Sequence, residues 1–264
     1  MGLYLGSTDI SGASFKLGSS DVSALYLGST ELWSAGGLPA VIDNFDFFYS
    51  ADQGSSWTDQ STSGNDGTES SFGTGGTITY TGGATPYWEF DDGTTGGRRI
   101  DTGWAPGAMG AGTDWSMIMV MANTDSTNNQ YPLGYEDAGN DTLQMIAHKN
   151  DFFAANLYGG GTFGSLCCSG TTTIDQMYIV MIVSTGGSDS TWRLYTNNSL
   201  DTSSTTNDLD GTDNFFVGYD FTSLDCSNCY NKMKVAAAGF IKGYALTSTD
   251  RTDIYNYYDA IYSF

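Results

Sequence analysis

The sequence predicts an all-β protein, a two-sheet sandwich or jelly roll that ends in one short helix and is preceded by a small β-hairpin region. Three observations predict this class. Glycine supplies 35 of the 264 residues and, with frequent Ser, Thr, Asn and Asp, provides many turns. Apolar residues make up 39% and aromatic residues 14% of the chain, enough for a packed core. From residue 41 onward, short apolar segments of strand length alternate with polar turns.

Residues 3–33 contain three copies of one short phrase: LYLGSTDIS, FKLGSSDVS and LYLGSTELW. The central Gly-Ser of each copy predicts a two-residue type II′ turn between antiparallel strands. This register places Lys16 opposite Asp21, a favourable charge pair, and Leu25 opposite Leu32. Each hairpin then has one small apolar face, and together the three faces contain Leu3, Leu5, Ile10, Phe15, Leu17, Val22, Leu25, Leu27, Leu32 and Trp33.

A hairpin of this size is marginally stable alone in water. Its apolar face either packs on the chain's own main domain or is buried in an assembly with sister subunits or a larger particle. Repeats that cannot bury a face alone favour assembly. The stretch SAGGLPA has the composition of a linker. We therefore expect a hairpin assembly region at 1–35, a linker at 36–40 and a β-sandwich domain at 41–264.

Within the main domain, apolar segments predict strands at 85–90, 114–123, 131–136, 142–148, 177–185, 191–197, 214–220 and 235–246. About ten strands are expected in all. The segment at 114–123 is the most apolar of them and predicts a buried strand. A terminal helix is predicted because Ser248 or Thr249 can cap it and Ile254, Tyr258 and Ile261 recur at helical spacing.

The charge balance excludes some classes of partner. Thirty acidic residues against nine basic ones give a formal net charge of −21, and no Lys or Arg cluster is visible. Nucleic-acid binding is therefore not expected, and anionic membranes would be repelled. No apolar run is long enough to span a bilayer, and residues 1–15 do not resemble a secretory signal, so neither membrane insertion nor a leader is expected.

Catalytic patterns are incomplete. Glu89 and Asp91 alternate along one predicted strand, so both could face one side, as glycoside hydrolysis by paired carboxylates requires. The third carboxylate of a Glu-x-Asp-x-x-Glu motif is missing, because Thr94 and Thr95 follow the Asp92-Gly93 turn. The single histidine, His148, ends a predicted strand. We expect a non-enzyme.

Cysteines and acidic loops offer further candidates. The four cysteines are Cys167, Cys168, Cys226 and Cys229. Disulfides between two loops are favoured, with free thiols and a zinc site as alternatives, and the pairing stays open. Another loop carries Asp208, Asp210 and Asp213 around Gly211 and partly matches a calcium loop, although a hairpin loop rich in turn-forming Asp is preferred. No cofactor is required, and Ca²⁺ is a candidate ligand.

Several phrases of the main domain occur in the order found in one known family. They are WTDQSTSGNDGT, YWEFDDGTTGGRRIDTG, DWSMIMVMAN, WRLYTNN and AGFIKGYALTSTDRTDIYNYY, between residues 57 and 258. In this order they resemble the concanavalin A-like lectin/glucanase fold in its laminin G-like (LamG) form. The hairpin repeats are similar to Leu-Gly-Ser-Thr elements of tailed-phage virion proteins.

The resemblance implies a phage structural protein, a fibre, neck or head decoration component, assembled in the host cytoplasm and located in the virion. Its expected partners are other virion proteins, two sister copies in a homotrimer, and host-surface glycans stacked on Trp57, Trp104 or Tyr135. The alternatives are the carbohydrate-binding module of a secreted protein and, least favoured, a glucanase-type glycoside hydrolase.

Overall fold

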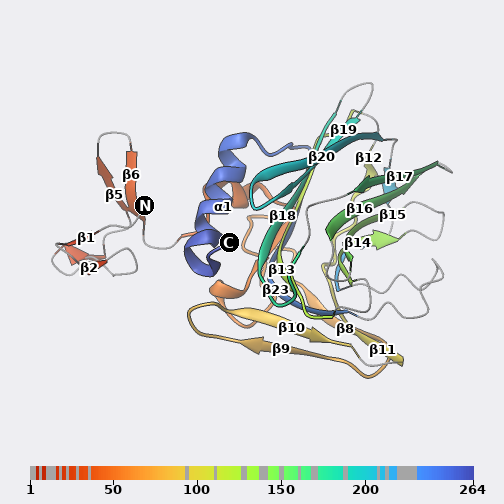
Figure 1. Ribbon diagram of the computed structural model, residues 1–264, viewed down its shortest axis with the longest axis horizontal. Helices are drawn as coiled ribbons and strands as arrows, with labels where there is room; N and C mark the ends of the chain where they lie inside the picture. The colour runs from red at the N-terminus through yellow and green to blue at the C-terminus, as the bar shows by residue number, and fades with distance from the viewer. Residues whose placement is uncertain are drawn as a thin grey trace. The chain divides into compact units, whose positions relative to one another are not determined.

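The structure is a computed structural model in which the chain separates into two compact units, Met1–Pro39 and Ala40–Phe264. Figure 1 shows their elements. From residue 37 onward the structure describes residues 37–92, 95–109, 112–125, 130–136, 142–148, 152–159, 162–167, 172–186, 190–206, 209–211, 214–218 and 231–264. Before residue 37 it describes six short strands.

The first unit contains the three predicted hairpins. Their strands are β1 (Tyr4–Leu5) with β2 (Thr8–Asp9), β3 (Lys16–Leu17) with β4 (Ser20–Asp21), and β5 (Ala24–Leu27) with β6 (Thr30–Ser34). The predicted pairing of Lys16 with Asp21 is confirmed. The third register is wrong at its end, because a bulge between Leu25 and Tyr26 pairs Leu25 with Trp33 instead of Leu32. Of the predicted assembly residues, Leu3, Ile10, Phe15 and Val22 lie outside the described residues, and the others are described as backbone.

The second unit is an all-β sandwich, as predicted. Its larger sheet has eight strands among the described residues, and all its pairings are antiparallel. Seven follow the order β20 (Ser199–Thr206), β19 (Ser190–Thr196), β18 (Tyr178–Thr185), β13 (Trp115–Asn123), β23 (Lys232–Lys242), β10 (Tyr87–Asp91) and β9 (Thr77–Thr81). The eighth, β7 (Phe47–Ser50), pairs with the later part of β23.

The smaller sheet is also antiparallel, and its seven described strands follow the order β17 (Thr162–Cys167), β16 (Phe152–Gly159), β15 (Thr142–His148), β14 (Gln130–Glu136), β22 (Phe216–Val217), β11 (Thr95–Asp101) and β8 (Thr68–Thr74). A separate pair joins β12 (Gly107–Met109) to β21 (Leu209–Gly211). Two short 3₁₀ helices, η1 (Ala40–Asn44) and η2 (Ala51–Gln53), flank β7.

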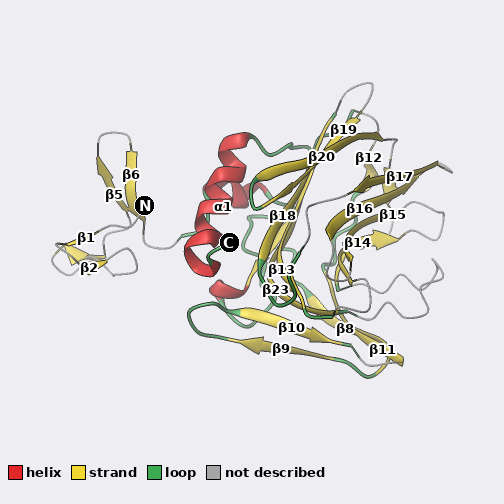
Figure 2. Cartoon of the chain, in the orientation of Figure 1, coloured by secondary structure: helices red, strands yellow, loops and turns green. Residues whose placement is uncertain are grey.

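The central strands of the larger sheet, β13, β18 and β23, are buried on both faces. Along β13 every residue is buried, although alternate side chains of a strand point to opposite faces. Met117, Met119 and Met121 belong to the core between the sheets. Ile118 and Val120 are fully buried outside that cluster, on the opposite face. Figure 2 shows helix α1 (Ser248–Tyr262) on that side of the sheet. Double burial explains why this strand is apolar without alternation.

Helix α1 is joined to the larger sheet by specific contacts. Its Ile254 and Tyr258 are fully buried, and the Tyr258 hydroxyl lies 2.6 Å from Ser50 Oγ at the end of β7. Arg251 lies over the ring of Tyr195 on β19, 4.0 Å from its centroid. The predicted cap was wrong by one or two residues. Thr247 is the N-cap, because its hydroxyl accepts a bond from the Asp250 backbone in a capping box.

The loop after η2 is held by one carboxylate. Asp59, only 9% exposed, accepts bonds from the backbone N–H groups of Phe48 (2.8 Å), Ser61 (2.9 Å) and Asn65 (2.8 Å). It also accepts from the Ser61 hydroxyl at 2.9 Å, and the Asn65 side chain donates to the Asp46 carbonyl at 2.6 Å. The Asp and Ser-Gly-Asn residues of this loop therefore have a structural role, fixing it against β7.

The strand predictions differ from the structure in two ways. Predicted boundaries are close for most apolar strands, and β15 matches its prediction at both ends. Strand β23 ends at Lys242 instead of 246, because Gly243 has a φ of +84°. The predicted number of about ten strands was too low. Polar strands such as β8, β9 and β20 were missed because their Thr and Ser residues match the composition of turns.

Asp59→Ala should lower the free energy of unfolding by about 3 kcal/mol, because four donors lose a charged acceptor and three of them are backbone groups. Denaturant unfolding measures this change. Ser61→Ala, which removes only the hydroxyl bond, is the matched control and should cost about 1 kcal/mol. An Asp59→Ala protein as stable as the wild type would contradict the structural role.

Candidate functional site

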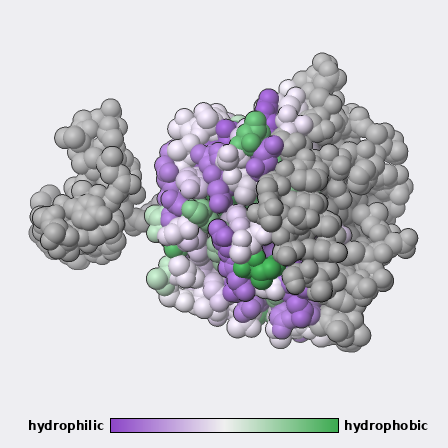
Figure 3. All heavy atoms as spheres, viewed as in Figure 1, coloured by the Kyte–Doolittle hydropathy of each residue, from purple (hydrophilic) through white to green (hydrophobic). Residues whose placement is uncertain are grey.

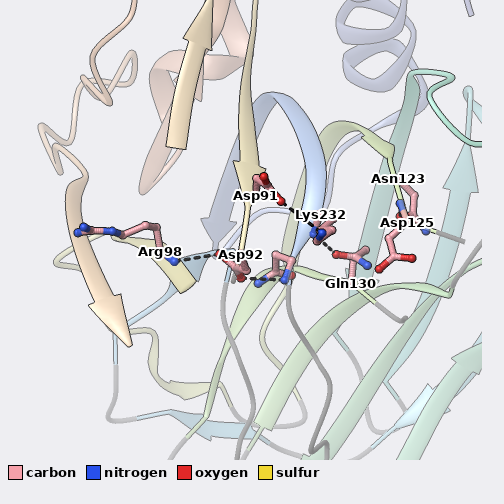
Figure 4. A network of polar contacts seen from close by, with 8 residues as sticks. Asp91, Asp92, Arg98, Asn123, Asp125, Gln130 and Lys232 are labelled. Carbon is pink, nitrogen blue, oxygen red and sulfur yellow. Dashed lines mark hydrogen bonds and ion pairs between the residues drawn. The ribbon is translucent and has the colours of Figure 1, made fainter. Parts of the chain in front are cut away.

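Buried polar side chains gather at one end of the sandwich, where β10 and β13 end and β14 and β23 begin. We call this group the polar end, and its members, none more than 4% exposed, are Asp92, Asn123, Gln130 and Asn231. Figure 4 shows the exposed or half-exposed side chains of Asp91, Asp125 and Lys232 close to them. Buried polar groups in proteins are almost always hydrogen-bonded, so the hydrogen-bond partners of these four side chains explain why they are buried here.

Asp92 joins three strands. Its Oδ1 accepts a bond from the Arg98 backbone in β11 at 2.9 Å, and its Oδ2 accepts from the Asn231 backbone before β23 at 2.7 Å. The Asp92 N–H in turn donates to the Asn231 carbonyl at 3.0 Å. A Cβ at Gly97 would lie 2.0 Å from the Asp92 carboxyl carbon, so only glycine leaves room for this carboxylate.

The two amide residues extend the network across the sandwich. Asn231 Oδ1 accepts a bond from the Tyr131 backbone at 2.9 Å, and Gln130 Oε1 accepts from the Lys232 backbone. Strand β14, which contains Gln130 and Tyr131, belongs to the smaller sheet, whereas β23 belongs to the larger one. Together with Asp92, these side chains therefore bind the two sheets to each other at this end.

Asn123 organises the neighbouring loops. Its side-chain oxygen accepts a bond from the Asp125 backbone at 3.0 Å, and its carbonyl accepts from the Asp175 backbone at 2.9 Å. The Asp175 carboxylate is bound by the Lys234 ammonium at 2.7 Å. The segments that follow β13 and precede β18 are thus fixed to the same frame.

Burial is the main influence on the Asp92 carboxyl. It raises the pKa from 3.8 to about 6, against the bonds from Arg98 and Asn231 that favour the charged form, and the nearby Asp91 charge adds to the increase. At the surface, the Lys232 ammonium lies 3.4 Å from the Asp91 carboxylate, with both side chains largely exposed. An exposed pair of this kind contributes little to stability. Both groups can therefore bond to a ligand at little cost.

This arrangement suits recognition of a polar ligand. The buried network fixes the backbone of several loop segments, while Asp91, Asp125 and Lys232 supply carboxylate and ammonium groups beside it. Binding groups are commonly carried by loops that a rigid scaffold positions. On the face drawn in Figure 3, the described residues are mostly hydrophilic, with small separate hydrophobic areas.

The two predicted candidate carboxylates lie on one face of β10, as their alternation suggests. Trp88 and Phe90 point into the core, so Glu89 and Asp91 lie on the outer face. Glu89 is paired across the strands with Lys234 on β23, and Asp91 with Lys232. Each carboxylate therefore has a lysine as its cross-strand neighbour. That His148 has no catalytic role stays a prediction, because only its backbone is described, at the end of β15.

Burial corrects the predicted sugar-stacking residues. Tyr135 is fully buried, with its ring 5.1 Å from that of Phe215. Trp57 is 9% exposed and stacks on Trp88, with 3.9 Å between the ring centroids. Trp104 is half-buried and packs against the same core. A sugar stacks on a ring face that is open to solvent, so Tyr135 and Trp57 are core residues and cannot form the predicted platform.

The predicted disulfide and calcium residues fall largely outside the described part of the chain. Cys168, Cys226, Cys229, Asp208 and Asp213 are not described, and Cys167 and Asp210 are described only as backbone of β17 and β21. Both predictions stay open. Among the side chains that are described, no three His, Cys, Asp or Glu residues form a group that could hold a metal ion.

Comparison of the sequence with models of protein families and with curated proteins finds no match. Solved structures do match. The botulinum neurotoxin serotype G binding domain has a TM-score of 0.60 at 11% identity, over 81% of this chain and 51% of that one. The serotype D binding domain has a TM-score of 0.59 at 10% identity, over 81% of this chain and 51% of that one. A structure of botulinum neurotoxin type C, whose cell entry depends on interaction with two ganglioside molecules, has a TM-score of 0.54 at 10% identity, over 82% of this chain and 51% of that one.

These similarities concern the fold. The chain spans about half the length of the neurotoxin domains that it matches, and the identity is low. The molecule is therefore a β-sandwich domain of a kind that also occurs in receptor-binding proteins. In the described part of the chain, no helix has the length and apolar character of a membrane span.

The pKa of Asp92 predicts how stability depends on pH. Its folded-state value of about 6 exceeds 3.8, so the folded protein holds this proton more tightly than the unfolded chain. The free energy of unfolding should therefore rise as pH falls from about 7 through 6 towards 4, by up to about 3 kcal/mol from this group. Denaturant unfolding across this range should show a smaller rise in Asp92→Asn, which cannot titrate.

Asp253→Asn, on the exposed side of α1, is the control for the change in net charge. Its free energy of unfolding should change with pH as it does in the wild type. Equal slopes in Asp92→Asn and the wild type would show that this carboxyl does not take up a proton in the folded state.

Proposed function

We propose that the sandwich is a non-catalytic binding module that recognises a host-surface glycan at its polar end. One observation carries the proposal: four buried polar side chains hold segments of both sheets in place beside exposed or half-exposed carboxylate and ammonium groups. Sugar hydroxyls both donate and accept hydrogen bonds, and carboxylates and ammonium groups are strong partners for them.

The charge of the chain narrows the ligand. A formal net charge of −21 repels anions over the whole surface, and Asp91, Asp125 and Asp175 add negative charge around the polar end. A neutral glycan is therefore favoured over a sialylated or sulfated one. The binding-domain neighbours agree with a binding role, and they share only the fold with this chain.

We further propose that residues 1–35 anchor the module in a tailed-phage virion, as part of a fibre, neck or head decoration. The support is the separate N-terminal unit and its three paired hairpins. Two-stranded hairpins of this size need a partner for stability. Other virion proteins and two sister copies in a homotrimer would supply the partner surface.

Glycan binding can be tested with the 264-residue chain on an array of neutral and sialylated glycans, followed by titration of any ligand found. Neutral glycans should bind. Asp125→Ala and the double variant Asp91→Ala/Lys232→Ala should each weaken binding by roughly tenfold or more, because each removes hydrogen bonds to charged groups.

Asp253→Ala removes an exposed carboxylate on α1 and should bind as the wild type does. If no glycan binds, or if the polar-end variants bind as well as the wild type, the glycan site is not at this end.

Anchoring can be tested by removing residues 1–35. The shortened chain should keep its unfolding free energy, because the sandwich has its own core, and it should no longer join the particle. Its assembly mass, measured by light scattering, should fall about threefold if the hairpins hold a trimer. Unchanged assembly after the deletion would rule out the anchor.

A further inference from the structure

Strand β9 is the outermost strand of the larger sheet. It pairs with β10 on one side, and no described strand pairs with its other side. Figure 1 shows β9 at the margin of the sandwich. An edge strand presents a row of unpaired backbone donors and acceptors, which can pair with another chain.

Natural proteins usually protect such an edge with charged residues or proline, and β9 has neither. Its sequence is TITYT, with two glycines on each side. The chain as a whole carries 30 acidic residues, and the opposite edge strand, β20, contains Asp201. Strand β9 is therefore an uncharged edge on a highly charged protein.

The side chains of β9 also leave apolar area uncovered. Thr77, Thr79 and Thr81 are exposed on the outer face, whereas Ile78 and Tyr80 face the core and are only partly buried against it. Their cross-strand partners on β10, Phe90 and Trp88, are almost completely buried. A further strand beside β9 would cover Ile78 and Tyr80 as β9 covers its neighbour.

We propose that β9 pairs antiparallel with β9 of a second copy of this chain, with Thr79 at the two-fold axis. This register is self-complementary. It places Ile78 opposite Tyr80 of the partner subunit, and Tyr80 opposite the partner's Ile78. Cross-strand pairs of an aromatic and a β-branched residue are favourable, and so are pairs of threonines, which Thr77, Thr79 and Thr81 would form. The two larger sheets become one continuous sheet.

The charges nearest this edge permit the approach. Glu89 and Asp91 on β10 are each paired across the strands with a lysine of β23, Lys234 and Lys232. The Lys232 ammonium lies 3.4 Å from the Asp91 carboxylate and offsets its charge. The Lys234 ammonium, in contrast, is bound to Asp175. The remaining net charge still repels a second copy at long range, and salt screens that repulsion. Association should therefore strengthen as ionic strength rises from about 0.01 M to 0.15 M.

Sedimentation of the 264-residue chain at about 0.15 M salt tests the pairing. Thr79→Lys and Thr79→Glu each put like charges directly opposite each other, so each variant alone should have about half the assembly mass of the wild type. A mixture of the two should recover the wild-type mass, because Lys then faces Glu. Ser203→Lys, an exposed substitution on β20, is the matched control and should keep the wild-type mass.

Recovery in the mixture separates loss of pairing from misfolding, because a misfolded variant would not be rescued by another. The proposal is overturned if the mass is unaffected by Thr79→Lys, if the mixture is not restored, or if the wild type shows no association through this strand at any salt concentration tested. Deletion of the hairpins should lower the assembly mass about threefold, whereas the Thr79 variants should lower it about twofold. Failure of the anchor proposal is therefore distinguishable from failure of the β9 pairing.

Discussion

Burial of the central strands of the larger sheet on both faces is the constraint on which the rest of the structure depends. Strands β13, β18 and β23 pack against the smaller sheet on one side, and helix α1 lies on the other (Figure 2). Such strands accept few polar side chains, so polar groups are displaced to the ends and edges of the sheet. Close packing shows at Gly239, where a Cβ would lie 2.4 Å from the Phe48 ring. Binding surfaces are therefore confined to loops and outer strands.

The polar end combines a stabilising network with the surface that we propose for glycan recognition. Asp92 and Gln130 each connect a strand of one sheet to the backbone of the other, so the network closes the sandwich where the apolar core ends. A fully bonded network of this kind rigidifies its surroundings, whereas a partly bonded one would be costly. Burial away from water raises the pKa of Asp92 even though its carboxylate accepts bonds from Arg98 and Asn231. The same rigidity fixes the loops that we propose for glycan recognition.

Three surfaces of the chain then have separate roles in the proposed assembly. We propose the hairpins of the first unit for anchoring, the polar end for a ligand that forms hydrogen bonds, and the uncharged edge strand β9 for pairing with a sister sandwich. Their chemistry differs, so each can be removed without the others. The large negative charge repels a second copy at long range, and β9 is the uncharged edge at which we propose that two copies pair.

Sequence by itself determined the all-β class, the hairpin register around Lys16 and Asp21, the long apolar strands and the terminal helix, because local periodicity and turn chemistry decide these features. Only the tertiary structure decided which polar and aromatic residues are buried. Asp92 and Asn231 lie 139 positions apart and belong to no common sequence pattern. The sequence is equally compatible with exposed and buried positions for Trp57 and Tyr135, and only the packing of the two sheets buries them. Burial depends on which distant strands pack together, and no short stretch of sequence contains that information.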